Sequence, residues 1–138
     1  MHVSLPGAAV LLLVLAACRT TSTISPPGLA EAVILRSQAA RAWDVVAAAG
    51  VVGSIVRFDE PGGAGRAWFS VRNCFAQEVG IVDVEGRAWR YRPHQRDPEW
   101  LGTGTVLDGA ARILGTGSDA SLAEVPLDTV AERAAAPR

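Results

Sequence analysis

The sequence predicts an all-β fold, a small antiparallel meander of repeated hairpins that closes into a barrel or a two-layer sandwich. Two observations support this prediction. Short runs of Val, Ile, Trp and Phe alternate with turn signals at intervals of about 8–12 residues. In addition, the tetrapeptide Gly-Arg-Ala-Trp at 65–68 recurs at 86–89. Because an isolated hairpin is only marginally stable in water, we expect the hairpins to share one core.

The first 17 residues contain no Asp, Glu, Lys or Arg, and their apolar run, 7–17, is 11 residues long. A spanning helix needs about 20 apolar residues, so this run is typical of a secretory signal peptide. The segment ends in Leu15-Ala16-Ala17-Cys18, which resembles the lipobox of bacterial lipoproteins. The resemblance implies cleavage before Cys18 and acylation of that cysteine, with palmitate among the chains attached.

An acylated protein of this kind is held at a membrane by its N-terminal lipid anchor, because each buried methylene contributes about 0.8 kcal/mol. The resemblance therefore implies a place in the cell envelope. Arg19 follows the cysteine, where an aspartate would indicate retention at the inner membrane. In a Gram-negative cell we therefore expect the outer membrane, with the domain facing the periplasm.

Composition divides the rest of the chain into three parts. Residues 18–30 contain the lipidated cysteine and a small, polar, proline-containing stretch that suits a flexible tether. Residues 31–116 form the predicted β-domain. Residues 117–138 are rich in Ala, Asp, Glu and Pro and lack aromatic side chains, which predicts a disordered or weakly helical tail.

Each strand is predicted from β-branched and aromatic residues between turn signals. Residues 31–41 are ambiguous, because their alanines favour a helix whereas Ala-Val-Ile-Leu and the strand-like residues that follow favour a sheet, and we interpret the segment as strand. Glu85-Gly86 and Asp108-Gly109 suit two-residue hairpin loops. A degenerate third copy of the hairpin repeat is predicted at 104–112. The predicted strands are 32–36, 42–47, 51–58, 66–72, 78–84, 87–92, 104–108 and 110–114.

Four arginines and His94 lie within residues 87–96. Alternation along a strand places Arg90 and Arg92 on one face, close enough to bind one phosphate or carboxylate. One hypothesis is a site for an anionic lipid, a glycan phosphate or an acidic partner. The alternative is that these arginines pair with acids of neighbouring strands, such as Asp83, Glu85 or Asp108. The candidate ligand-binding residues are Trp89, Arg90, Arg92, His94 and Arg96.

Catalytic groups are scarce. His94 lies near Asp97 and Glu99, as in a hydrolytic or metal site, but it is the one histidine left after signal removal. A zinc site would need further ligands from elsewhere. We therefore expect no enzyme activity, no catalytic or metal-binding residues and no cofactor. A lipid-anchored hydrolase that uses His94 with Asp97 or Glu99 is the alternative.

Two further features leave alternatives open. The tryptophans at 43, 68, 89 and 100 could form a sugar-stacking platform, although aromatic residues on strands more often form core or cross-strand pairs. Cys74 is either a buried small apolar residue or an exposed thiol.

The net charge of −1 argues against nucleic-acid binding. The function predicted is that of a membrane-anchored envelope lipoprotein. Its non-catalytic β-domain would have a binding or structural role and would bind an anionic envelope ligand, a glycan or a protein partner.

Overall fold

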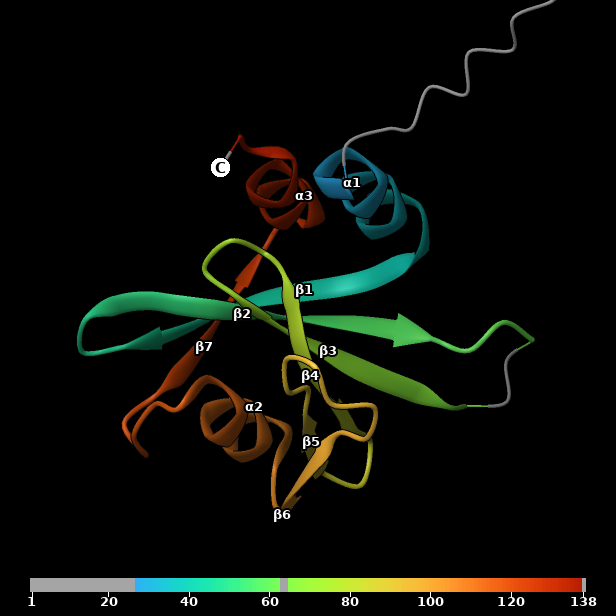
Figure 1. The fold of residues 1–138 in the computed structure, drawn as a ribbon. Coiled ribbons are helices and arrows are strands. Elements are labelled where there is room, and N and C mark those ends of the chain that lie inside the picture. The colour runs from blue at the N-terminus through green and yellow to red at the C-terminus, as the bar shows by residue number, and fades with distance from the viewer. Residues whose placement is uncertain (1–26, 63–64, 138) are drawn as a thin grey trace, which may run out of the picture.

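The computed structural model describes residues 27–62 and 65–137. Seven antiparallel strands form one open, twisted sheet in the order β6-β5-β4-β3-β2-β1-β7, with helices on both faces (Figure 1). The fold is therefore mixed α/β, and the prediction of an all-β barrel or sandwich is wrong. The sheet does not close, because β6 and β7 are its two edges.

The elements follow one another along the chain with short connections. Their bounds are α1 Pro27–Gln38, β1 Ala39–Ala47, β2 Gly50–Asp59, β3 Ala67–Asn73, β4 Glu78–Asp83, β5 Arg87–Arg90, β6 Glu99–Thr103, α2 Val106–Leu114, β7 Ser121–Val125 and α3 Leu127–Ala135.

The hairpin repeat describes two real hairpins, β2–β3 and β4–β5. In each, the glycine of Gly-Arg-Ala-Trp has a positive φ, 69° at Gly65 and 78° at Gly86. At Gly86 an added Cβ would also lie 1.6 Å from the carbonyl oxygen of Gly104, so no other residue fits there. The glycine of the repeat is therefore explained by the turn, which needs a residue with a positive φ at this position.

The predicted strand 32–36 is wrong, because these residues belong to α1, which also includes residues 27–30 of the predicted tether. Ala32 and Leu35, three residues apart, are buried together on one side of the helix. They pack with Ala131 and Ala134 of α3 and with Val56 of β2. The local sequence is ambiguous between strand and helix. The packing of Ala32 and Leu35 against α3 and β2 stabilises the helix.

The predicted strands 104–108 and 110–114, and with them the third repeat copy, are wrong because the segment forms α2. Thr105 and Asp108 form a capping box, in which the Thr105 hydroxyl accepts from the Asp108 amide and the Asp108 carboxylate accepts from the Thr105 amide. Gly115 ends the helix in the left-handed conformation. The Asp108-Gly109 pair is therefore the first turn of a helix and not a hairpin loop.

For residues 117–138 the prediction is a disordered or weakly helical tail, and the disorder is wrong, because they contain β7 and α3. β7 pairs with β1, and α3 buries Val130, Ala131 and Ala134 against α1 and the sheet. The exposed residues of β7 give no alternating pattern from which the strand could be predicted.

Two apolar cores lie on opposite faces of the sheet. The first joins α1 and α3 to β1 and β2 through residues such as Ala42, Val56 and Phe58. The second joins α2 to the other face of the sheet through Val71, Val82 and Ile113, among others. In Figure 1, α1 and α3 lie above the sheet and α2 lies below it.

The predicted signal peptide 1–17, Cys18 and tether residues 18–26 lie outside the described residues. Among the helices of the described part, none is long and apolar enough to cross a membrane.

Candidate binding surface

Arg90 and Arg92 come together, as alternation predicts, but around a carboxylate of the same chain. Arg90 Nε and Nη2 donate to Glu99 Oε2 at 3.0 and 2.6 Å, and Arg92 Nε donates to the same oxygen at 3.0 Å. Arg92 Nη2 also donates to Glu99 Oε1. Hydrogen bonds from Arg92, and next from Arg90, hold the pKa of Glu99 below its usual range. These two arginines therefore tie the β5 end to β6.

The other members of the predicted anion site do not join this pair. Trp89 lies on the opposite face of β5 from Arg90, because side chains alternate along a strand. His94 and Arg96 are exposed in the β5–β6 loop, where His94 has a φ of 62°. Neither makes a side-chain hydrogen bond with another described residue.

The structure does not bring His94 together with Asp97 or Glu99 in the arrangement that the hydrolase alternative requires. Glu99 is bonded to two arginines, and Asp97 is exposed in the loop. No group of three or more His, Cys, Asp or Glu side chains is placed to hold a metal within residues 27–62 and 65–137. Cys74 is an exposed thiol in the turn after β3.

A row of side chains crosses four strands on the face of the sheet opposite α2. Ser70, Ile81, Trp89 and Trp100 are successive partners on β3, β4, β5 and β6. Directly paired residues of antiparallel strands share a face, so all four side chains point the same way. Trp68, two residues before Ser70, lies on that face too. The row therefore brings three of the four tryptophans to one side of the sheet.

The helices leave this part of the sheet uncovered. On this side α1 and α3 pack over β1 and β2, and α2 packs on the other face. Trp68, Tyr91 and Trp100 consequently stay exposed, and Trp89 and Ile81 are half-buried. Tyr91 follows β5, and its amide donates to the Val79 carbonyl at 2.9 Å. We call this surface the aromatic face: Trp68, Ile81, Trp89, Tyr91 and Trp100.

The rings of the aromatic face are held in place by neighbours. Trp68 stacks on Phe58 with ring centroids 5.4 Å apart and planes 12° from parallel. Trp89 and Trp100 meet at 58° with centroids 5.2 Å apart. The Arg87 guanidinium lies 6.0 Å from the centre of the Trp89 ring. Such contacts fix the rings before any partner arrives, which lowers the entropy lost on binding.

One border of the aromatic face is the β4–β5 turn. Arg87 Nε donates to Asp83 Oδ2 at 2.5 Å, and Arg87 Nη2 donates to Glu85 at 3.3 Å. The Asp83 carboxylate also accepts from the amides of Glu85 and Arg87. Partial desolvation opposes ionisation of Asp83, but the bonds from Arg87 outweigh it and lower the pKa of the carboxyl. The border is thus polar and internally paired.

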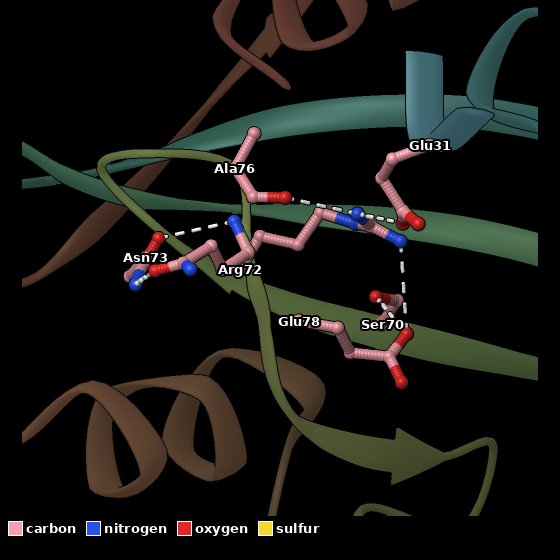
Figure 2. Close-up of polar contacts among 7 residues, drawn as sticks. Glu31, Ser70, Arg72, Asn73, Ala76 and Glu78 are labelled. Atoms are coloured by element: carbon pink, nitrogen blue, oxygen red, sulfur yellow. Dashed lines mark hydrogen bonds and ion pairs between the residues drawn. The ribbon is translucent and has the colours of Figure 1, made fainter. Parts of the chain in front are cut away.

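The other border is a buried polar cluster centred on Arg72, whose side chain is 2% exposed. Figure 2 shows its guanidinium between Glu31 of α1 and Glu78 of β4. Arg72 Nη1 also donates to the Ala76 carbonyl at 3.0 Å, and Ser70 Oγ donates to Glu78 Oε2 at 2.5 Å. This cluster joins α1 to the sheet beside the aromatic face.

Tyr91 faces the same cluster. Partial burial, followed by the charge of Glu78 and a hydrogen bond to it, raises the pKa of Tyr91 to about 12. The phenol therefore keeps its proton to high pH and donates a hydrogen bond to Glu78 at the border of the aromatic face.

Trp43 lies apart from the other tryptophans, on the α2 side of the sheet. It lines an open apolar groove of about 260 Å³ with Ile55, Phe69, Val106 and Leu122. Arg41 and Arg57 are at its rim, where they pair with Glu124 and Asp59. The four tryptophans therefore do not form a single platform.

Sequence reasoning missed the aromatic face as a unit, although one signal for it was present. Trp68 and Trp89 occupy the same position in the two copies of Gly-Arg-Ala-Trp. Equivalent positions of successive hairpins in one antiparallel sheet lie on the same face when the register is kept. Trp100 could not be added, because its strand was not predicted.

Comparisons with family models, with curated proteins and with solved structures find no match to this chain, so the geometry alone supports an assignment.

Proposed function

We propose that this chain is a lipid-anchored envelope protein whose domain binds another protein through the aromatic face. The observation that carries the proposal is the convergence of Trp68, Trp89, Trp100 and Tyr91 on the face of β3 to β6 that none of the described helices covers. The lipid anchor rests on the lipobox at residues 15–18.

A protein partner is favoured by the composition of the surface. Tryptophan, tyrosine and arginine are the residues that contribute most at protein interfaces. An exposed apolar patch with a polar rim is typical of such an interface. Here the aromatic centre lies between the paired groups of Asp83 and Arg87 on one side and the Arg72 cluster on the other.

The surface is better suited to binding than to catalysis. Beside the aromatic face, Glu78 accepts a hydrogen bond from Ser70 and pairs with Arg72, and Asp83 pairs with Arg87. These carboxylates hold ion pairs, so neither is poised as a general acid or base.

The test is photo-crosslinking in living cells that produce the full-length chain. The photoreactive amino acid p-benzoylphenylalanine replaces Trp100, which is 53% exposed, or Val51, which is 46% exposed and lies at the β1–β2 hairpin. We expect a discrete protein adduct from position 100 and none of that mass from position 51.

Other results would overturn the proposal. An identical set of adducts from both positions, or none from position 100, would show that the aromatic face meets no specific protein. A ladder of adducts that collapses after treatment with a glycan hydrolase would assign the surface to a polysaccharide instead.

A further inference from the structure

The first helix carries apolar side chains on two sides. Ala32 and Leu35 point inward, to α3 and the sheet. Leu29, Val33 and Ile34 point outward and are 48%, 62% and 39% exposed. A surface helix normally has a polar outer side, and a helix that is apolar on all sides is normally buried. The outer side of α1 therefore has the composition of a covered surface.

We propose that this outer side of α1 lies on the lipid bilayer in which Cys18 is anchored, an inference that rests on the lipid anchor of the proposed function. Pro27 follows Cys18 by nine residues (27 − 18). Even a fully extended chain spans at most about 3.6 Å per residue, so the helix begins within about 30 Å of the anchor. The anchor therefore holds the start of α1 within reach of the membrane surface.

The charges on α1 fit a lipid surface. The first turn of the helix has no acidic residue. Glu31 is turned inward, to the Arg72 guanidinium. Arg36, in the last turn, pairs with Asp128 of α3 at 2.9 Å, which neutralises that carboxylate. No unpaired acid on the described turns of α1 would therefore oppose contact with anionic headgroups.

Docking of α1 would orient the whole domain. The sheet lies between α1 and α2, so α2 faces away from the bilayer (Figure 1). The Arg72 cluster joins α1 to β3 and β4, so the aromatic face is held at a fixed angle to the membrane. A partner would then meet the aromatic face in one orientation.

The test places an environment-sensitive dye at single cysteines of the acylated, full-length product. In a Cys74→Ser background, Val33→Cys reports on α1, and Ser118→Cys, in the exposed loop after α2, is the control. The protein is reconstituted into vesicles of phosphatidylethanolamine and phosphatidylglycerol. We expect a blue-shifted emission, quenched by spin-labelled lipid, at position 33 and a water-like emission at position 118.

Different results would overturn the lipid anchor at Cys18 and the docking of α1. An intact mass without acyl groups on Cys18 would overturn the anchor and, with it, this inference. An acylated protein with water-like emission at position 33 would overturn the docking of α1 and leave the anchor in place. Lipid-like emission at both positions would also overturn it, because the domain would have no fixed orientation.

Discussion

Arg90 and Arg92 both bind the carboxylate of Glu99. The shared orientation of the two arginines could be predicted from the sequence, but the carboxylate that they bind could not. Alternation places both guanidinium groups on one face, and the structure supplies Glu99 of β6 as the acceptor. Because the pKa of Glu99 is lowered in the folded state, the carboxylate stabilises the fold above its unfolded pKa. This contribution is lost as the pH falls through the lowered value.

The titration of Tyr91 tests the geometry beside the aromatic face. The chain has one tyrosine, so phenol ionisation, followed by absorbance at 295 nm, belongs to this residue. With a pKa of about 12, Tyr91 should remain largely neutral at pH 11, where an ordinary phenol is mostly ionised. Because the folded pKa is raised, stability should fall as the pH rises from about 10 towards 12.

Glu78→Gln is the matched variant for this titration. Removal of the charge should lower the pKa of Tyr91, while partial burial keeps it above that of a free phenol. Circular dichroism at each pH confirms that the fold is intact. An ordinary phenol titration in the folded wild type would show that Tyr91 does not lie against Glu78.

At the scale of elements, the central strands could be predicted because each carries its own pattern. β1 to β5 coincide with the predicted strands 42–47, 51–58, 66–72, 78–84 and 87–92 to within a few residues. The helices differ, since α1 has only a weak local pattern and is stabilised by packing against α3 and the sheet, whereas α3 is amphipathic, with Val130, Ala131 and Ala134 on its buried side. α2 had the clearest signal, the capping box from Thr105 to Asp108.

The contact of α2 with the sheet can be tested at Gly109. An alanine suits a helix better than glycine by about 1 kcal/mol. However, its Cβ would lie 2.8 Å from Val82 Cγ2 and 3.1 Å from Ala88 Cβ. Because overpacking costs about 1–3 kcal/mol, Gly109→Ala should lower the free energy of unfolding, measured by urea denaturation.

A double-mutant cycle with Val82→Ala tests whether contact with Val82 is the cause of the destabilisation. Val82→Ala alone should destabilise the core, and Gly109→Ala should cost less in that background, because the crowding methyl groups are gone. Additive effects, or a more stable Gly109→Ala protein, would show that α2 does not pack closely on β4.

At the scale of the molecule, the chain forms one sheet with helices on opposite faces. The aromatic face is open because α1 and α3 cover β1 and β2 and leave β3 to β6 uncovered on their side. That asymmetry could not be predicted, because the sequence carries only weak helical signals for α1 and α3 and nothing that places them on the sheet. Only one part of this surface could be predicted from the sequence. Trp68 and Trp89 occupy the same position in the two copies of the hairpin repeat, which indicates that they lie on one face.

The proposed lipid anchor predicts the outcome of palmitate labelling in the full-length chain. Metabolic labelling with palmitate should mark the wild type and Cys74→Ala, but not Cys18→Ala. Cys74 is the matched control, since the chain has two cysteines. Equal labelling of Cys18→Ala and the wild type would show that Cys18 is not acylated.

If photo-crosslinking identifies a partner, its affinity for the full-length protein is the most direct test of the aromatic face as the binding surface. Truncation of a hot-spot tryptophan typically costs about 2 kcal/mol, so Trp100→Ala should weaken binding by about thirtyfold. Val51→Ala, a similarly exposed position outside the aromatic face, should leave the affinity unchanged. Equal affinity of the Trp100→Ala protein and the wild type would contradict the assignment of the aromatic face as the binding surface.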